Sequence, residues 1–473
     1  MNRWADKHVL VLGLGETGLS LVRWLSAQGA HVRVADSRSE PPGAAALRGE
    51  FPQVEVHCGA FSDSLLQGVT LVAISPGVPL AEPLVQQAIA RGIPVEGDIE
   101  LFAQELNSGT SIPAPRVIAI TGANGKTTVA SMVEHMCQSA GKDAIAAGNI
   151  SPAVLDVMME RGVKQPDVWV LELSSFQLET TSSLNADAAT VLNISEDHLD
   201  RYASMDDYAA AKARIFKNCA VQVLNRDDAR SIVMAIPGRH IVTFGIEPGG
   251  AGMAATGNED GRTTGGDWGI INEGADVWLA HGNQRLMKAS ELQVSGMHNV
   301  ANSLAALALC RAIGMSLPLL LDALRTFKGL PHRVERVAEI DGVIYYDDSK
   351  GTNVGATEAA LRGLGCKAVV ILGGEGKGQD FAPLNPAVAQ HARGVVLIGR
   401  DAPLIEAALQ GCGVPIVRAS DMVDAVNQSV RLARAGDAVL MSPACASFDM
   451  FRNYTHRAEA FVAAVRGLTK EVA

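Results

Sequence analysis

At about 150 residues per domain, a chain of 473 residues predicts about three domains, each large enough to bury a core. Its net charge of -11 argues against a nucleic-acid partner, because nucleic-acid phosphates require a basic surface. No apolar stretch approaches the ~18 residues of a membrane helix and residues 1–8 show no signal-peptide pattern, so we expect a cytoplasmic protein without a membrane partner.

The first part of the chain predicts a Rossmann-type βαβ unit. A strand at residues 9–12 precedes Gly13-Leu14-Gly15-Glu16-Thr17-Gly18, a helix continues to about Gln28, and a second strand ends in Asp36. This pattern suggests a dinucleotide, although a single fingerprint is weak evidence about the ligand. A further strand at residues 71–74 runs into a tight turn, which is consistent with either a ligand-facing loop or an ordinary turn.

The second part, after a Pro-containing linker at residues 111–115, carries the most informative pattern. An apolar strand at 117–120 runs into Thr121-Gly122-Ala123-Asn124-Gly125-Lys126-Thr127-Thr128, a short variant of the phosphate-binding P-loop. Glycines let backbone N–H groups surround phosphate oxygens, Lys126 reaches the β- and γ-phosphates, and Thr127 can bind Mg²⁺. We therefore predict that the chain uses ATP.

Two more strands of this part, at residues 168–173 and 189–194, end beside acidic or polar groups, where parallel sheets place ligands. Residues 248–266 are rich in Gly, Thr and Asn and predict a surface excursion.

The third part begins after Lys328-Gly329-Leu330-Pro331-His332-Arg333, where a helix ends. Its strands are expected at residues 342–346, 368–372, 394–398 and 438–441. This spacing again predicts a parallel sheet with helices. Each strand is followed by a polar or glycine-rich cluster, so the clusters are expected to line one cleft.

Taken together, these segments resemble the Mur ligase family from the first strand to almost the last helix. The resemblance is carried by the P-loop and by further motifs: Glu172-Leu173-Ser174-Ser175-Phe176-Gln177-Leu178-Glu179, Glu196-Asp197-His198-Leu199-Asp200-Arg201-Tyr202, Gly329-Leu330-Pro331-His332-Arg333, Asp348-Ser349-Lys350-Gly351-Thr352-Asn353 and Ser442-Pro443-Ala444-Cys445-Ala446-Ser447. It implies an α/β fold of three domains: a Rossmann-like UDP-sugar-binding domain (1–97), a central P-loop ATPase-type domain (98–329), and a C-terminal Rossmann-like domain (330–473) that binds the amino acid and closes on ATP.

The resemblance also implies an activity. An ATP-dependent ligase of this kind joins D-glutamate to UDP-N-acetylmuramoyl-L-alanine for peptidoglycan precursor synthesis, with Mg²⁺, two ions being expected, and as a monomer. The substrate carboxylate attacks the γ-phosphate to form an acyl phosphate, which the amine of D-glutamate then attacks. Asn124 favours the glutamate-adding member, because the alanine-adding member usually carries a Thr-His-Gly-Lys type P-loop.

The matching motifs imply roles for individual residues. The implied catalytic residues are Lys126, His198, Arg333 and Lys350. The implied ATP contacts are Gly122, Asn124, Gly125, Lys126, Thr127, Thr128, Asn299, Arg333 and Asp348. The implied metal ligands are Thr127, Glu172, His198 and Lys212. The resemblance implies that Lys212 is carbamylated, although composition alone predicts a solvated helix lysine at this position.

Substrate contacts follow from the same motifs. The nucleotide sugar is expected to contact Thr17, Ser37, Arg38, Asn149, Ser174 and Gln177. Because D-glutamate carries two carboxylates, its site needs cations and hydroxyl donors. The residues assigned to substrate binding in the third part are Thr352, Lys377, Ser447, Phe448 and Tyr454. The chain departs from the family at Glu375, where Asp is expected, and at Tyr454, where Phe is expected.

Other functions stay open. A dehydrogenase would use the first glycine pattern for NAD, but it would leave the P-loop, Arg333 and the pair Lys350 and Lys377 without a task. A nucleotide-sensing module would bind ATP without releasing phosphate. A sister Mur ligase that adds another amino acid and a folylpolyglutamate-type synthetase are nearer alternatives.

Overall fold

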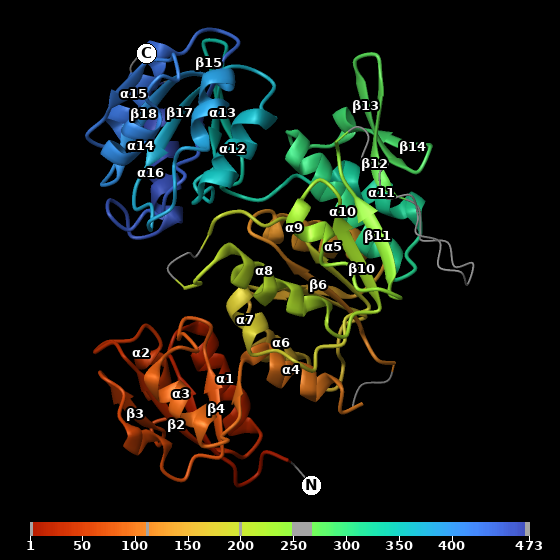
Figure 1. Cartoon of the computed structure of the whole chain (residues 1–473), viewed down its shortest axis with the longest axis vertical. Helices are drawn as coiled ribbons and strands as arrows, with labels where there is room; N and C mark the ends of the chain where they lie inside the picture. Colours follow the sequence, from red (N-terminus) through yellow and green to blue (C-terminus); the bar gives the residue numbers. More distant parts are fainter. Residues whose placement is uncertain (1–2, 110–112, 198–200, 248–266, 469–473) are drawn as a thin grey trace.

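The structure is a computed structural model that describes residues 3–109, 113–197, 201–247 and 267–468. Three sheets follow one another along the chain, each with its own helices (Figure 1). We name the parts that carry them the first, central and third domains. The predicted α/β class with three domains is confirmed. The predicted excursion at 248–266 lies outside the described residues.

The first sheet has five parallel strands in the order β3-β2-β1-β4-β5. Its strands are β1 (His8–Leu12), β2 (His31–Asp36), β3 (Glu55–Cys58), β4 (Leu71–Ile74) and β5 (Val95–Glu96). The helices are α1 (Glu16–Ala27), α2 (Ala44–Glu50), η1 (Asp63–Leu66), α3 (Pro83–Ala90) and α4 (Asp98–Leu106). Along β1, Val9 and Val11 face one apolar core while Leu10 and Leu12 face the other. The strand is apolar throughout because it is covered on both faces.

The central sheet has nine strands in the order β14-β13-β12-β11-β10-β9-β6-β8-β7. Its strands are β6 (Arg116–Thr121), β7 (Ala144–Gly148), β8 (Val168–Glu172), β9 (Ala188–Val191), β10 (Val221–Asn225), β11 (His240–Phe244), β12 (Trp268–Glu273), β13 (Asp276–His281) and β14 (Gln284–Lys288). The helices are α5 (Lys126–Ser139), α6 (Val154–Arg161), α7 (Ser175–Glu179), α8 (Met205–Ala213), η2 (Arg214–Phe216), α9 (Ala229–Ile232), η3 (Ala289–Glu291), α10 (Met297–Ala312) and α11 (Leu317–Thr326). From β7 to β12 the pairing is parallel, whereas β12, β13 and β14 pair antiparallel.

The third sheet has six strands in the order β15-β16-β20-β17-β18-β19. Its strands are β15 (Glu335–Ile340), β16 (Val343–Asp347), β17 (Ala368–Gly373), β18 (Ala392–Ile398), β19 (Ile416–Arg418) and β20 (Ala438–Met441). The helices are α12 (Val354–Gly363), α13 (Leu384–His391), α14 (Ala402–Ala408), α15 (Met422–Leu432) and α16 (Tyr454–Leu468). The four predicted strands are present in a parallel arrangement, and β15 joins β16 antiparallel.

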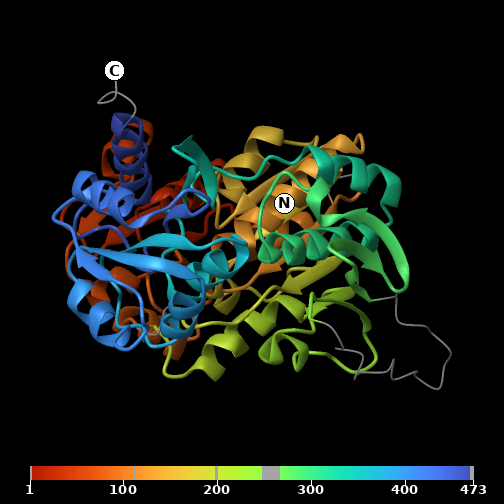
Figure 2. The ribbon, with the colours of Figure 1, turned by 90° about the horizontal axis from the view of Figure 1, so that it is seen from above.

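The central domain contacts both neighbours. Helix α1 packs on α6, and Ser151 Oγ donates to Glu16 Oε1 at 2.6 Å between the first and central domains. The third domain follows α11 through a segment in which His332 and Val334 have positive φ angles of 63° and 50°. Figure 2 shows the third domain (blue) on one side and the strands around residue 280 (green) on the other. Among the described residues, no helix is long and apolar enough to cross a membrane.

Candidate active site

The P-loop connects β6 to α5. Gly125 has a φ of +84°, and a Cβ atom there would lie 2.7 Å from Asn302 Oδ1, so both backbone and space require glycine. Lys126 begins α5, and its Nζ donates to the carbonyl oxygens of Gly122 and Ala123 at 2.9 and 3.0 Å. These bonds hold the ammonium group at the positive end of a helix, where an anionic phosphate is favoured.

Glu172 ends β8 beside the P-loop. Its side chain is buried, and Oε1 accepts a hydrogen bond from Asn149 Nδ2 at 2.8 Å. Its Oε2 atom is buried and has no hydrogen-bond partner among the described residues. A buried carboxylate oxygen without a donor is costly unless a cation binds it, and oxygen is the ligand that Mg²⁺ prefers. Glu172 therefore fits the predicted metal site, whereas His198 lies outside the described residues.

Lys212 on α8 is 2% exposed, so the composition-based expectation of a solvated lysine is wrong. Its Nζ lies 2.9 Å from Gly122 O, the same carbonyl oxygen that accepts from Lys126, and 4.6 Å from the Tyr208 ring centroid. Burial, followed by the charge of Lys126, lowers the pKa of Lys212 well below its ordinary value. The neutral amine is favoured because two buried ammonium groups would repel each other at one oxygen.

Cations of the third domain reach the P-loop. Arg333 Nη2 donates to Thr127 Oγ1 at 2.7 Å, across 206 residues of sequence. Lys350 Nζ lies 3.9 Å from the Tyr454 ring centroid, and burial together with the charge of Arg333 lowers its pKa to about 8. These residues line a cavity of about 620 Å³ between the two domains. The predicted site residues that line it are Asn124, Gly125, Lys126, Thr127, Asn149, Glu172, Arg333, Lys350, Thr352 and Tyr454.

A second cavity, of about 180 Å³, lies beside the P-loop on the α10 side. The predicted ATP contacts that line it are Asn124, Gly125, Thr128, Asn299, Arg333 and Asp348. The amide of Asn299 already donates to Ser295 O at 2.8 Å. Asp348 accepts from Ser442 Oγ at 2.6 Å, and burial raises its pKa to about 7. Both side chains are thus held by protein groups at the cavity wall.

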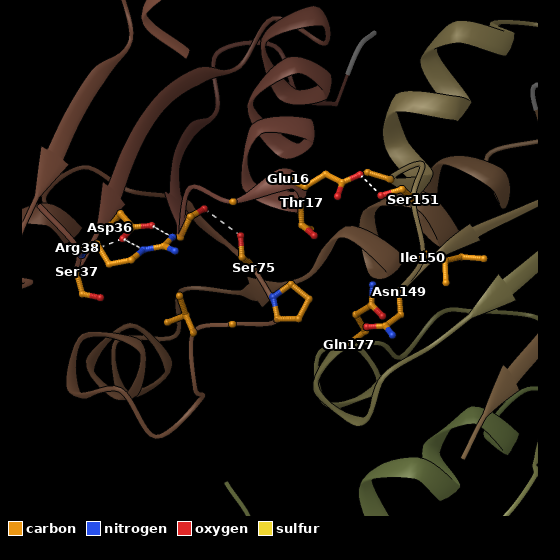
Figure 3. A pocket seen from close by; sticks show the side chains of 17 residues that line it. Glu16, Thr17, Asp36, Ser37, Arg38, Ser75, Asn149, Ile150, Ser151 and Gln177 are labelled. Carbon is orange, nitrogen blue, oxygen red and sulfur yellow. Dashed lines mark hydrogen bonds and ion pairs between the residues drawn. The ribbon is translucent and has the colours of Figure 1, made fainter. Parts of the chain in front are cut away.

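A third cavity, of about 540 Å³, lies between the first and central domains (Figure 3). The predicted nucleotide-sugar contacts that line it are Thr17, Ser37, Arg38, Asn149 and Gln177. Arg38 pairs with Asp36 at 2.6 Å, and this hydrogen bond lowers the pKa of Asp36 to about 2 despite its burial. Asp36 also accepts from the backbone N–H of Leu14 at 2.7 Å, so its carboxylate fastens the glycine-rich loop.

Ser174 and Gln177 form a capping box at the start of α7. Ser174 Oγ accepts from the backbone N–H of Gln177, and Gln177 Oε1 accepts from the backbone N–H of Ser174, both at 3.1 Å. Gln177 Nε2 also donates to Asp98 Oδ2 at 3.1 Å, and burial raises the pKa of Asp98 to about 6. Gln177 touches the cavity between the first and central domains, whereas the geometry of Ser174 is that of a helix cap.

The predicted glutamate-site residues are only partly brought together. Thr352 and Tyr454 line the P-loop cavity, whereas Lys377, Ser447 and Phe448 are not among the described residues that line it. An antiparallel bridge between Glu375 and Ala446 nevertheless places the loops after β17 and β20 side by side. Lys377 is exposed on the first loop, Ser447 is buried on the second, and Phe448 is 67% exposed.

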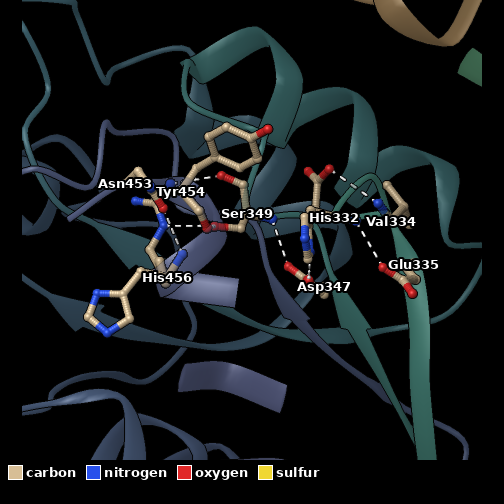
Figure 4. A network of polar contacts seen from close by, with 10 residues as sticks. His332, Val334, Glu335, Asp347, Ser349, Asn453, Tyr454 and His456 are labelled. Atoms are coloured by element: carbon tan, nitrogen blue, oxygen red, sulfur yellow. Dashed lines mark hydrogen bonds and ion pairs between the residues drawn. The ribbon is translucent and has the colours of Figure 1, made fainter. Parts of the chain in front are cut away.

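His332, Glu335 and Asp347 offer donor atoms within 4.8 Å of one another (Figure 4). His332 Nδ1 lies 2.7 Å from Asp347 Oδ2, and the backbone N–H of His332 donates to Glu335 Oε2 at 2.9 Å. The His332 ring and the Asp347 carboxylate therefore bind each other, and the Glu335 carboxylate holds the His332 backbone, so the three residues stabilise the bend between the central and third domains.

Several residues around the P-loop were missed in the sequence. Asn193 Oδ1 accepts from the backbone N–H of Asn124 at 2.8 Å, and Asn353 Nδ2 donates to Asn124 Oδ1 at 3.0 Å. Asn193 belongs to the polar end of a predicted strand, and Asn353 ends a quoted motif. The sequence therefore marks both asparagines as members of polar motifs, but it does not show that they contact Asn124.

Known proteins match the chain along nearly its whole length. Family models match the Mur ligase MurD-like N-terminal domain at residues 7–97, the Mur ligase middle domain at 120–310 and the Mur ligase glutamate ligase domain at 332–445. A UDP-N-acetylmuramoylalanine--D-glutamate ligase of Nitrosospira multiformis is 58% identical over 466 residues, covering 98% of this chain and 96% of that protein. The ligase of the same name from Thiobacillus denitrificans is 57% identical over 479 residues, covering 99% and 98%.

Solved structures share the fold. The UDP-N-acetylmuramate-alanine ligase MurC of Thermotoga maritima matches with a TM-score of 0.58 at 20% identity, over 97% of this chain and 99% of that one. A pseudomurein peptide ligase type C from Methanothermus fervidus matches with a TM-score of 0.59 at 18% identity, over 99% and 100%. The family models and the close relatives together show that the chain belongs to the Mur ligase family.

Proposed function

We propose that the chain is an ATP-dependent ligase that adds D-glutamate to UDP-N-acetylmuramoyl-L-alanine in cytoplasmic peptidoglycan precursor synthesis. The observation that carries the proposal is the convergence of Lys126, Thr127 and Glu172 with Arg333 and Lys350 around one cavity. Groups that bind a nucleoside triphosphate thus meet cations of another domain where an anionic substrate can react. The relatives that are 57–58% identical carry the name of this activity.

The reaction divides between the two faces of the cavity. When the substrate carboxylate attacks the γ-phosphate, negative charge on the phosphate oxygens is stabilised by Lys126 and Arg333. ADP leaves, and the new acyl phosphate presents an electrophilic carbonyl carbon. The amine of D-glutamate attacks this carbon, loses a proton and displaces inorganic phosphate. Lys350 and Thr352 would hold the incoming carboxylates, together with Lys377 and Ser447 on the neighbouring loops.

Mg²⁺ would be held by Thr127 and Glu172, with His198 and a carbamylated Lys212 as further ligands. The ion would neutralise phosphate charge during transfer. Carbamylation follows from attack of a neutral amine on carbon dioxide with loss of a proton, and the burial of Lys212 favours that neutral amine. The resulting anion would turn the repulsion between Lys126 and Lys212 into attraction. Carbon-13 NMR after incubation with labelled bicarbonate should show a carbamate signal that Lys212→Ala lacks; equal signals would contradict the modification.

Binding of the substrates is assigned by domain. Residues 1–97 would bind the uridine nucleotide with Thr17, Ser37 and Arg38, while residues 98–329 would bind ATP. Residues 330–473 would bind the amino acid, with Phe448 and Tyr454 at that site. The functional unit would be a monomer.

A phosphate-release assay tests the proposal directly. With ATP, Mg²⁺ and UDP-N-acetylmuramoyl-L-alanine present, phosphate should appear only when D-glutamate is added. L-alanine, L-glutamate and a folate acceptor serve as controls for sister ligases and folylpolyglutamate-type synthesis. Phosphate release with another amino acid instead, or ATP binding without release, would overturn the assignment.

A further inference from the structure

Helix α12 of the third domain lies against α10 of the central domain, beside the nucleotide cavity. Its small side chains Ala356, Ala359 and Ala360 line this cavity. Lys350 and Thr352 stand directly before the helix. The position of α12 therefore determines how far these two residues lie from the P-loop.

The N-terminal end of α12 is held by Asn353, which is 6% exposed. Its Oδ1 accepts from the backbone N–H of Ala356 at 2.9 Å and so caps the helix. Because that N–H can only donate, the amide orientation is fixed and Nδ2 faces Asn124 Oδ1 at 3.0 Å. Asn124 Nδ2 continues the chain of hydrogen bonds to Ser195 Oγ at 3.2 Å.

At the C-terminal end of α12, Gly363 contacts Gly296 and the ring of His298, which belong to the central domain. A Cβ atom on Gly363 would lie 2.8 Å from His298 Nδ1 and 3.2 Å from Gly296 Cα. A Cβ atom on Gly296 would lie 2.6 Å from His298 Cε1. Gly296 of the central domain and Gly363 of the third domain thus lie directly against each other, with the imidazole ring of His298 beside both, and a Cβ atom on either glycine would require displacement.

We propose that Asn353 and the Gly296–His298–Gly363 contact are the two docking points of α12, and that they position the third domain so that Lys350 and Thr352 face the P-loop. The inference rests on the proposed ligase function. Asn353 and Gly363 are positioning residues, since each acts through another group. The hydrogen bond between Asn353 and Asn124 also connects the P-loop directly to the loop that carries Lys350.

Gly363→Ala separates positioning from folding. Gly363 ends α12 without a positive φ, so alanine should leave the third domain itself folded because it favours a helix, and the cost of its Cβ should fall on the contact between the domains. Its Cβ should oppose docking, which lowers kcat/KM for ATP about tenfold or more. Gly467→Ala on α16 is the matched control, because open space surrounds that glycine. Adding His298→Ala to Gly363→Ala should recover part of the lost activity, since it removes the clashing ring.

Asn353→Ser is the second, independent variant. Serine still caps the helix but is too short to reach Asn124, so kcat and ATP affinity should fall while the melting temperature stays near that of the unchanged protein. Asp421→Ser, at the cap of α15, controls for the change of capping residue. Activity of Asn353→Ser and Gly363→Ala equal to that of their controls would overturn the inference.

A binding measurement keeps this test distinct from that of the proposed function. Small-angle scattering with a non-hydrolysable ATP analogue reports docking without any turnover. The unchanged protein should become more compact, and Gly363→Ala should become less compact than Gly467→Ala under the same conditions. If the unchanged protein showed no ligase activity, the proposed function would be refuted. The scattering comparison would still test whether Gly363 is a docking point of α12. Equal compaction of both variants would refute the docking.

Discussion

Lys126 places an ammonium group at the N-terminal end of α5, where phosphate charge develops during transfer. Lys126→Ala should reduce phosphate release by at least ~100-fold, the usual cost of deleting one preorganised charge contact. Calorimetric binding of the nucleotide sugar should not change, because its cavity is lined by other residues. Release within tenfold of the unchanged enzyme would contradict the assignment of the P-loop.

Lys212 should be as important as Lys126 although it comes from a different helix. Lys212→Ala should abolish phosphate release, bicarbonate should not restore it, and small carboxylic acids should restore part of it by supplying the missing anion. Lys217→Ala is the control, since that lysine is exposed and directly follows η2. Normal turnover by Lys212→Ala would leave the residue with a packing role only.

His298 predicts a pH effect on stability. Burial lowers its pKa from 6.5 to about 4, so between these values the unfolded chain binds a proton that the folded protein does not. Above pH 6.5 this difference vanishes; as the pH falls towards 4, the folded state loses up to about 1.4 kcal/mol per pH unit. Asp348 has the opposite effect, because its pKa is raised from 3.8 to about 7.

The contribution of His298 is therefore measured as a difference. Urea unfolding of the unchanged protein and of His298→Asn is compared from pH 7 down to pH 4.5, where Asp348 contributes equally to both. The unchanged protein should lose stability relative to His298→Asn as the pH falls. If the free energy of unfolding changed with pH in the same way for both proteins, the His298 ring would be protonated as readily in the folded state as in the unfolded state.

Some of these residues were predictable one by one and others were not. Lys126 and Thr127 stand in a local pattern whose chemistry depends only on neighbours in the sequence. Lys212 lies on a short alanine-rich helix without a clear apolar face, so nothing local predicts that its amine is buried against Gly122. The Ser-x-x-Gln spacing of Ser174 and Gln177 predicts a helix cap, and the structure shows that cap; the substrate contact of Ser174 stays a prediction.

At the scale of elements, the capping box of α7 gives a prediction of its own. Ser174→Ala removes a hydrogen bond to the first turn and should lower the free energy of unfolding by about 1 kcal/mol. Nucleotide-sugar affinity should change little, because the residue fastens the helix. A large loss of affinity with unchanged urea unfolding would instead support a direct substrate contact.

Element prediction succeeded for several strands that are buried on both faces but not for all of them, because β10 is buried inside the central sheet and was not predicted. The apolar runs of β1, β6, β17 and β20 stand out because no polar residue interrupts them. Strand β15 was missed because it alternates charged and half-buried residues at the edge of its sheet. Strands β13 and β14 were not predicted either; both begin with exposed polar residues and lie at one end of the central sheet (Figure 1).

At the scale of the whole molecule, the third domain should move. Its contacts with the P-loop include the bond from Arg333 to Thr127, and the apolar side chains beside His332 in the connecting segment, Leu330 and Val334, are only partly buried. Small-angle scattering should show a smaller radius of gyration with an ATP analogue and the nucleotide sugar than without them. An unchanged radius of gyration would mean that the domains stay docked with and without ligands. In that case a bulky label attached across the bend should slow turnover but leave the radius of gyration unchanged.

The arrangement of the domains was the least predictable feature. Motifs order the domains along the chain, but they do not say which side chains meet. The bonds from Arg333 to Thr127 and from Asn353 to Asn124 span 206 and 229 residues. Such contacts depend on how the three domains pack against one another, which no local pattern encodes.

The segment Asn149 to Ser151 lines both the cavity between the first and central domains and the cavity at the P-loop. One molecule could therefore occupy both by passing over this short segment. If two fragments each bind at about 10 μM, a short flexible tether with a millimolar effective concentration would strengthen binding about a hundredfold. The shared wall thus makes fragment linking across residues 149–151 a direct route to an inhibitor of this ligase.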